Sequence, residues 1–144
     1  MASKPDIQLA SDLRTVVGRL IKKLRKESVT GQQLSLTERS TLALLLQHKE
    51  LLPNELAAME KITAQSMSQL LKHLEELGYI SRKASETDKR KVIISLTELG
   101  EHTILQVRAE REEWLLNAIS ITCSEEEVLA LKQAIGPLTK LVDF

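Results

Sequence analysis

The segment from Leu77 to Gly100 constrains the fold more than any other part of this chain. Two runs rich in β-branched residues, Tyr79–Arg82 and Val92–Leu96, flank a polar stretch that can turn back on itself, so we predict a β-hairpin. The stretch from Arg82 to Lys91 is basic, with five cations against two acids: Arg82, Lys83, Lys89, Arg90 and Lys91 against Glu86 and Asp88. A hairpin tipped with cations, directly after a helix, has a shape that lies along a phosphate backbone.

The composition indicates one mainly helical domain over residues 1–144. The chain has only three aromatic residues, five glycines and three prolines, and its apolar residues are mostly Leu, Ile and Ala, which favours long packed helices. The net charge is zero, but DNA binding needs only a local basic surface.

Three features indicate a cytoplasmic protein without a membrane partner. A single cysteine, Cys123, excludes an intrachain disulfide and fits a reducing compartment. The longest apolar run, Leu42–Leu46, is too short to span a bilayer, and the first ten residues contain no signal-peptide core.

Apolar spacing and breaker residues predict about six helices around the hairpin. Their expected ranges are 6–27, 37–48, 54–60, 64–77, 98–120 and a last helix after 124. The expected N-caps are Thr37, Thr63, Thr97 and Ser124, the last in a capping box with Glu127. Gly78 is the expected glycine after the fourth helix, and Gly136–Pro137 is expected to kink or interrupt the last one.

The pair of helices at 54–60 and 64–77, joined by a tight turn at Lys61–Ile62, has the spacing of a helix-turn-helix, in which the second helix enters the major groove. On a helical wheel the second helix has one apolar face, comprising Ala64, Met67, Leu70, Leu71, Leu74 and Leu77. The opposite face carries Gln65, Ser68, Gln69 and Lys72, with Ser66 and His73 at its edges. Amide side chains can pair with adenine, and lysine can reach guanine or a phosphate. By itself this face also fits an ordinary polar surface; the basic hairpin that follows makes the DNA-binding interpretation specific.

At these residues the chain resembles the multiple-antibiotic-resistance regulator (MarR) family of bacterial winged helix-turn-helix repressors. The resemblance covers roughly residues 34–101 and is strongest at Asp88-Lys89-Arg90-Lys91 and at Leu96-Thr97-Glu98-Leu99-Gly100. It implies a winged helix-turn-helix over residues 34–100 and a helical dimerisation part over residues 6–28 and 101–144. It also implies a homodimer on double-stranded DNA with a pseudo-palindromic operator, and for many members a small aromatic or phenolic effector that releases the DNA.

The resemblance also gives roles to the hairpin residues. Arg90 matches the wing arginine that enters the minor groove, and Asp88 matches the carboxylate that braces it; a bidentate pair would hold the guanidinium in place. The competing interpretation of this pair is a surface ion pair at a turn. Lys83, Lys89 and Lys91 are expected to contact phosphates. Two positions depart from the family pattern: Lys61 stands where glycine is common, and Leu52–Pro53 where a hydroxyl cap is common.

No motif supports an enzyme, a cofactor or a metal site. The three histidines have no regular ligand spacing, and no phosphate-binding loop or nucleophile motif occurs. Cys123 is expected to be a small buried hydrophobic residue rather than a redox sensor. The six cations of Arg14–Lys26 and the six acids of Glu110–Glu127 are expected to be solvated helix faces. For the basic run, a contact with an anionic ligand is the second interpretation and an extra DNA contact the third.

Two functions from different classes remain open at this point. One is a dimeric DNA-binding repressor, and the other is a winged-helix module for protein–protein contact that does not bind DNA. The Asp88–Arg90 pattern favours the first.

Overall fold

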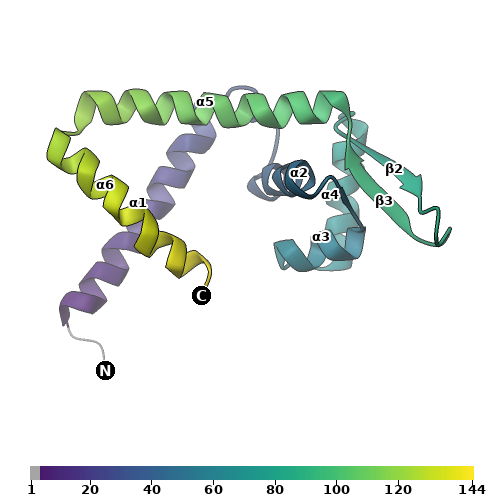
Figure 1. The fold of residues 1–144 in the computed structure, drawn as a ribbon, viewed down its shortest axis with the longest axis horizontal. Coiled ribbons are helices and arrows are strands. Elements are labelled where there is room, and N and C mark those ends of the chain that lie inside the picture. The colour runs from purple at the N-terminus through teal and green to yellow at the C-terminus, as the bar shows by residue number, and fades with distance from the viewer. Residues whose placement is uncertain (1–3) are drawn as a thin grey trace.

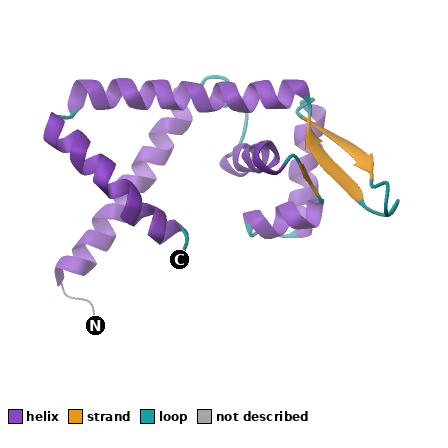
Figure 2. Cartoon of the chain, in the orientation of Figure 1, coloured by secondary structure: helices purple, strands orange, loops and turns teal. Residues whose placement is uncertain are grey.

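The computed structural model describes residues 4–144, and this part contains six helices and three short strands (Figures 1 and 2). In chain order the elements are α1 (Lys4–Glu27), α2 (Leu36–His48), β1 (Glu50–Leu51), α3 (Pro53–Glu60), α4 (Ala64–Glu76), β2 (Ile80–Ala84), β3 (Val92–Leu96), α5 (Glu98–Thr122) and α6 (Glu125–Val142). The predicted class, mainly α with a small β wing, is confirmed. The first three residues of the predicted single domain lie outside the described part.

Most of the predicted helix caps are confirmed. Thr63 accepts a hydrogen bond from the backbone of Ser66, Thr97 accepts one from Gly100, and Ser124 forms a capping box. These bonds satisfy backbone N–H groups that have no partner inside the helix.

The predicted cap of α2 at Thr37 is wrong. The cap is Ser35, whose hydroxyl accepts from the Glu38 backbone at 3.1 Å while Glu38 Oε1 accepts from the Ser35 backbone at 2.8 Å. The reciprocal pair satisfies two N–H groups, whereas a cap at Thr37 would leave the preceding turn unwound.

The last two helices run further than expected. α5 ends at Thr122 rather than near residue 120, and α6 continues through Pro137 to Val142, so Gly136–Pro137 does not interrupt the helix, which was one of the two effects predicted there. Proline removes one backbone donor, but it does not by itself end a helix. Cys123, between the two helices, is half-buried and not the buried residue that we expected.

The strands form one antiparallel sheet in the order β1-β3-β2. Ile80 pairs with Leu96 and Ala84 with Val92, so the predicted hairpin is present, although its first strand begins at Ile80 rather than Tyr79. β1 was not expected, because the sequence there reads as a helix break. Glu50 of β1 nevertheless pairs with Ser95 of β3, which extends the hairpin into a three-stranded sheet. We call the hairpin formed by β2, β3 and the turn between them the wing.

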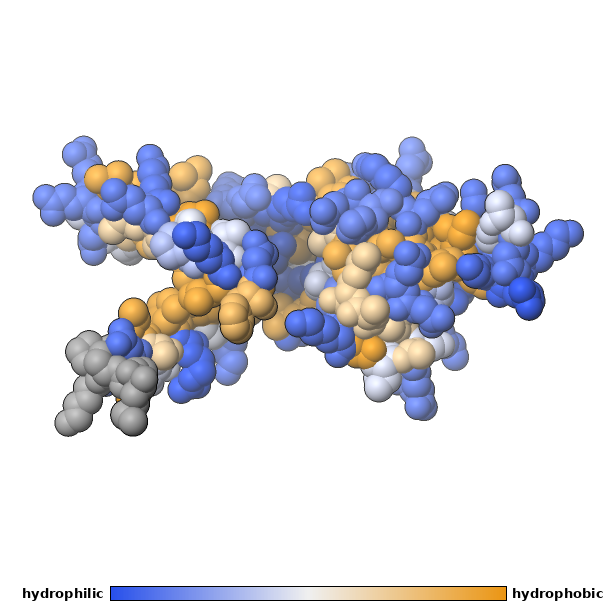
Figure 3. Space-filling model, turned by 60° about the horizontal axis from the view of Figure 1, so that its bottom comes forward, coloured by the Kyte–Doolittle hydropathy of each residue, from blue (hydrophilic) through white to orange (hydrophobic). Residues whose placement is uncertain are grey.

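The hydrophobic core lies in the half of the molecule that contains the wing. Its buried residues fall between positions 34 and 104: Leu34, Leu42, Leu45, Leu51, Leu56, Ala57, Met67, Leu71, Leu74, Tyr79, Ile80, Ile94 and Ile104. α6 begins at the end of α5 that is farthest from the wing, and α1 projects from the middle of α5 away from this half (Figure 1). α6 has no buried residue at all. Figure 3 shows hydrophobic side chains gathered on this side of the molecule, so much of the apolar surface of α1 and α6 is uncovered in one chain.

The loop between α1 and α2 joins the two halves and is held by two charged side chains. Glu110 of α5 accepts hydrogen bonds from Ser28 and Thr30. Arg39 of α2, which is buried, donates to the carbonyl of Gly31 at 2.6 and 3.1 Å and to that of Arg25 at 3.3 Å. These bonds attach the end of α1 to both α2 and α5.

The basic run on α1 is mainly a solvated face, because all six of its cations are exposed. Lys23 also lies over the ring of Trp114 on α5, 5.9 Å from its centroid, and within 3.9 Å of Glu27.

Candidate nucleic-acid interface

The turn between α3 and α4 is tight because Lys61 adopts a left-handed conformation. Its φ and ψ are 57° and 42°, and the backbone N–H of Ile62 bonds back to Ala57. Glycine is the residue that usually tolerates this conformation, so the departure noted at Lys61 changes the residue but not the shape of the turn. Thr63 then starts α4 directly.

α4 divides into a buried and an exposed face, as the wheel predicts. Met67, Leu71 and Leu74 are buried in the core, and Leu70 and Leu77 are partly buried, whereas Ala64 is exposed and does not belong to the packed face. The exposed face contains Gln65, Ser68, Gln69 and Lys72, the residues predicted to contact bases, and Ser66 at its edge is exposed as well. The Ser66 hydroxyl accepts a hydrogen bond from Thr63 at 3.0 Å, so it is engaged at the helix cap rather than free.

His73, at the edge of this face, has a partner that the sequence did not indicate. Its Nδ1 contacts the Oε2 atom of Glu38, which belongs to α2 and is almost fully buried. The contact joins α2 to α4.

The wing turn is closed by a small set of local hydrogen bonds. The buried hydroxyl of Ser85 accepts from the backbones of Thr87 and Asp88, both at 3.3 Å, and the Ser85 and Lys91 backbones are bonded at 2.9 Å. The turn therefore has a defined shape and presents residues 88–91 together.

Asp88 and Arg90 form the predicted bidentate pair at this turn. Arg90 Nε lies 3.2 Å from Oδ1 and Nη2 lies 3.5 Å from Oδ2, and the Arg90 backbone also donates to Oδ1 at 3.1 Å. The hydrogen bond from the Arg90 backbone, and to a smaller extent those from its side chain, hold the pKa of Asp88 below its usual value. The carboxylate therefore stays ionised. The Arg90 side chain is 91% exposed, so its guanidinium is held in place while it still faces solvent.

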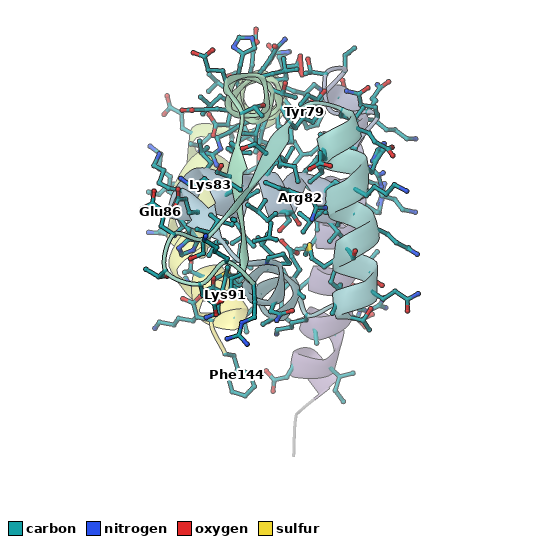
Figure 4. All side chains as sticks on the ribbon, turned by 90° about the vertical axis from the view of Figure 1, so that its right-hand side faces the viewer. Tyr79, Arg82, Lys83, Glu86, Lys91 and Phe144 are labelled. Atoms are coloured by element: carbon teal, nitrogen blue, oxygen red, sulfur yellow. The ribbon has the colours of Figure 1, made fainter. Side chains whose placement is uncertain are left out.

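The cations of the wing strands are paired with acids from neighbouring elements. Arg82 lies 2.9 Å from Glu75 of α4, and Lys83 lies 3.7 Å from Glu50 of β1. Figure 4 looks onto the wing and shows Arg82 directed toward α4, with Lys83 on the opposite side. Lys89 and Lys91 are exposed at the turn. The Arg82–Glu75 pair, which attaches the wing to α4, was not predicted, because the two residues belong to different elements and no local spacing relates them.

Residues 4–144 contain no group of acidic, histidine or cysteine side chains that could hold a metal ion. None of the helices in the same part of the chain is long and apolar enough to cross a membrane.

A helix pair with a tight turn, whose second helix has a polar exposed face and is followed at once by a basic hairpin, defines the winged helix-turn-helix class of DNA-binding proteins. Within that class, the model of the MarR family matches residues 32–91. An HTH-type transcriptional regulator of Mycobacterium bovis is 31% identical over 138 residues, which cover 96% of this chain and 95% of the relative. The chain belongs to the MarR family of transcriptional regulators, which are not enzymes.

Solved structures agree with this assignment. A transcriptional regulator protein of Pseudomonas aeruginosa is 33% identical, covers 99% of both chains and has a TM-score of 0.84. A mutant of Staphylococcus aureus MepR, solved bound to an oligodeoxyribonucleotide, has a TM-score of 0.70 and 22% identity, and the match covers 93% of this chain and 97% of the MepR chain. At that identity, MepR supports the fold alone.

Proposed function

We propose that this chain acts as a homodimeric repressor that binds a pseudo-palindromic operator through α4 and the wing. The observation that carries the proposal is the Asp88–Arg90 pair. A guanidinium that is 91% exposed and braced by a carboxylate is arranged for an external anion or a narrow groove, not for the core of its own protein. Arg90 is proposed to enter the minor groove, with Lys89 and Lys91 on neighbouring phosphates. Lys83 is expected to contribute less than these two, because Glu50 already offsets its charge.

The polar face of α4 is proposed to read the major groove. Gln65, Ser68 and Gln69 lie in the first half of the helix, near the end that usually meets base edges, and Lys72 follows one turn later. Duplex DNA as the partner implies action in the cytoplasm.

The dimer is proposed from the uncovered apolar surface of the terminal helices. Leu131 and Ile135 of α6 are 46% and 63% exposed, and Val16 and Leu20 of α1 are 59% and 41% exposed. A lone chain that leaves this surface in water forgoes the free energy of burying it, and a second copy could cover it. Two-fold symmetry would then present two copies of α4 to two half-sites about one helical turn apart.

An effector is proposed to bind beside α2 and α5 and to shift the dimer toward a form that does not fit the operator. A surface groove between these helices is lined by Ala43, Leu44, Leu46, Ser40, Gln47 and Arg108. Apolar walls with one cation suit a small aromatic compound that carries a phenolate or carboxylate. The ligand must bind one dimer conformation more tightly than the other to have this effect.

The alternative is a winged-helix module that binds another protein. The same exposed cations would then have no nucleic-acid partner.

A DNA-binding titration separates the two functions. The purified chain is titrated against a labelled duplex taken from upstream of its own coding sequence, at low and at physiological salt, beside Arg90→Ala and the control Lys140→Ala. We expect salt-sensitive binding by the parent and by Lys140→Ala, and a severe loss for Arg90→Ala with unchanged circular dichroism and sedimentation. A folded parent that binds no duplex at either salt concentration would favour the protein-binding module.

A further inference from the structure

An ion pair joins α4 to the wing. Arg82 Nε of β2 lies 2.9 Å from Oε2 of Glu75, which is in the last turn of α4, and the two side chains are 33% and 47% exposed. The chain between the two elements is short, since residues 77–79 alone separate α4 from β2. The pair therefore closes a small loop that contains the end of the helix and the start of the hairpin.

The pair lies at the point where the apolar packing of β2 ends. β2 is an outer strand of the sheet, and Ile80 is its one buried residue. Arg82 pairs with Ile94 of β3, which is fully buried, so the Arg82 side chain leaves the sheet on the face that packs against the helices. Figure 4 shows Arg82 directed toward α4. The ion pair thus acts on the part of the strand that leads to the turn with Arg90.

The base of the wing is held by different contacts, close to α5. Thr97 donates its backbone N–H to the carbonyl of Tyr79 at 3.1 Å and its hydroxyl to the carbonyl of Gly78 at 2.6 Å. An ion pair that is about half exposed adds little to the free energy of unfolding. Its removal should therefore leave the fold intact, and a change in DNA binding can be attributed to the wing.

We propose that Glu75 and Arg82 are positioning residues of the DNA complex. Their ion pair sets the angle between the wing and α4, so that Arg90 reaches the minor groove while α4 lies in the major groove. This inference rests on the proposed function. A protein that holds both elements in the binding arrangement before it meets DNA loses less conformational entropy on binding. Glu75 then strengthens the complex, although its charge has the same sign as that of DNA.

Electrostatics alone predicts the opposite effect of Glu75. A carboxylate near DNA repels the phosphates, and this one would also withhold Arg82 from a phosphate, so its removal would strengthen binding. A pair that serves only the fold would change the midpoint of thermal unfolding and leave the affinity for DNA as it was. The direction of the change in affinity therefore separates the three explanations.

The variants Glu75→Gln and Arg82→Gln each remove the ion pair, one from the helix and one from the wing. Glu76→Gln is the matched control, because Glu76 is the exposed neighbour on α4 and its replacement removes the same charge at the same end of the helix. For Glu75→Gln we expect an affinity for the upstream duplex that is about 3- to 30-fold lower than that of the parent. Glu76→Gln should bind as tightly as the parent or more tightly. The double variant of Glu75 and Arg82 should bind no more weakly than Arg82→Gln alone, and all thermal midpoints should stay close to the parental one.

The dependence on Arg90 is a result that a structural pair would not give. At low salt, where weak DNA binding is still measurable, Glu75→Gln is compared with its parent in an Arg90→Ala background. We expect most of the effect of Glu75→Gln to be lost there, because the side chain that the wing positions is gone.

A second measurement needs no DNA. Spin labels at Lys72→Cys on α4 and Glu86→Cys in the wing turn, both exposed positions, report the distance between the two elements in a Cys123→Ser chain. Labelled protein is mixed with excess unlabelled chain, so that any dimer carries one labelled copy. The distance distribution should shift or broaden in Glu75→Gln and keep the parental form in Glu76→Gln.

The outcomes distinguish this inference from the proposed function. If the parent binds and Arg90→Ala does not, but Glu75→Gln binds as tightly as the parent or more tightly, the function stands and the positioning role is wrong. The role is also wrong if Glu75→Gln weakens binding equally with and without Arg90, or if the spin-label distances stay the same. If the folded parent binds no duplex, the proposed function fails and the role in a DNA complex fails with it, whatever the spin labels report about the angle of the wing.

Discussion

Thr30 and Glu110 lie 80 positions apart in the chain and are joined by two hydrogen bonds: the Thr30 hydroxyl donates to Oε2 at 2.9 Å and its backbone N–H donates to Oε1 at 3.2 Å. Ser28 adds a third bond to the same carboxylate at 3.0 Å. One acidic side chain of α5 therefore fixes the loop through which α1 leaves the core-containing half. The direction in which α1 projects depends on it.

Glu110→Gln should destabilise the fold in a pH-dependent way. Desolvation raises the pKa of Glu110, but the hydrogen bonds from Thr30 and Ser28 outweigh it, so the pKa lies below its usual value. The carboxylate therefore stabilises the fold fully above the pKa of an unfolded glutamate, and this contribution is lost as the pH falls through the lower folded value. We expect a loss of about 1–2 kcal/mol at neutral pH, because the amide can replace only part of the charged hydrogen bonding.

Urea unfolding at neutral pH and at successively lower pH, at one protein concentration, tests this prediction. The difference in the free energy of unfolding between the parent and Glu110→Gln should become smaller as the pH falls. The exposed Glu112→Gln on the same helix should stay close to the parent throughout. A difference that does not change with pH would mean that the charge of Glu110 contributes nothing to the stability of the fold.

Gly100→Ala should damage the fold severely. A Cβ at this position would lie 2.0 Å from the carbonyl oxygen of Tyr79, which already accepts a hydrogen bond from Thr97 at 3.1 Å. Neither backbone can move without breaking the junction of wing and α5, so we expect a loss of about 3 kcal/mol or more. Thermal unfolding measures it, with the exposed neighbour Glu101→Ala as control; similar midpoints for both variants would contradict the close approach.

Lys61→Gly should stabilise the protein. Lys61 has a φ of 57°. This conformation costs a residue with a Cβ about 1–2 kcal/mol, and glycine avoids that cost. Glycine also gives the unfolded chain more conformational entropy, which offsets part of the stabilisation. The expected net gain in the free energy of unfolding is about 0.5–1 kcal/mol. Lys61→Ala is the matched control, because it loses the same side chain but keeps the strain. Equal stability of the two variants would show that strain at the turn is negligible.

Gln69→Ala should change sequence preference rather than affinity for DNA in general. An amide that pairs with a base edge accounts for about 1–3 kcal/mol of discrimination at that base pair. Competition between operator variants, each changed at one base pair, should show relaxed preference at one position per half-site. A uniform loss across all variants would instead identify Gln69 as a residue that only positions the helix.

Ile135→Glu should disrupt the proposed dimer. Ile135 is 63% exposed in a single chain, so a carboxylate costs little there unless a partner covers it. Sedimentation at micromolar concentration should show a dimer for the parent and for the exposed Lys132→Glu, and a monomer or unfolded chain for Ile135→Glu. A parent that sediments as a folded monomer would refute the dimer.

The sequence by itself determined the features that depend on neighbours a few positions apart. Thr63, Thr97 and Ser124 each cap a helix through a residue three positions later, and Asp88 braces Arg90 two positions later. The apolar spacing of α4 identified most of its buried face, because helical periodicity and burial repeat within one turn. Where two local signals compete, as Ser35 and Thr37 do at the start of α2, the pattern alone chose the wrong residue.

Only the tertiary structure decided the contacts between distant parts of the chain. These are the pairing of Glu50 with Ser95, the ion pair of Lys83 with Glu50, the contact of Glu38 with His73 and the bonds from Thr30 to Glu110. Each depends on how helices and strands pack in space, and no spacing in the sequence encodes that arrangement. The wing arginine, Arg90, could therefore be named from the sequence. Glu38, which contacts His73, and Glu110, which fixes the α1–α2 loop, could not.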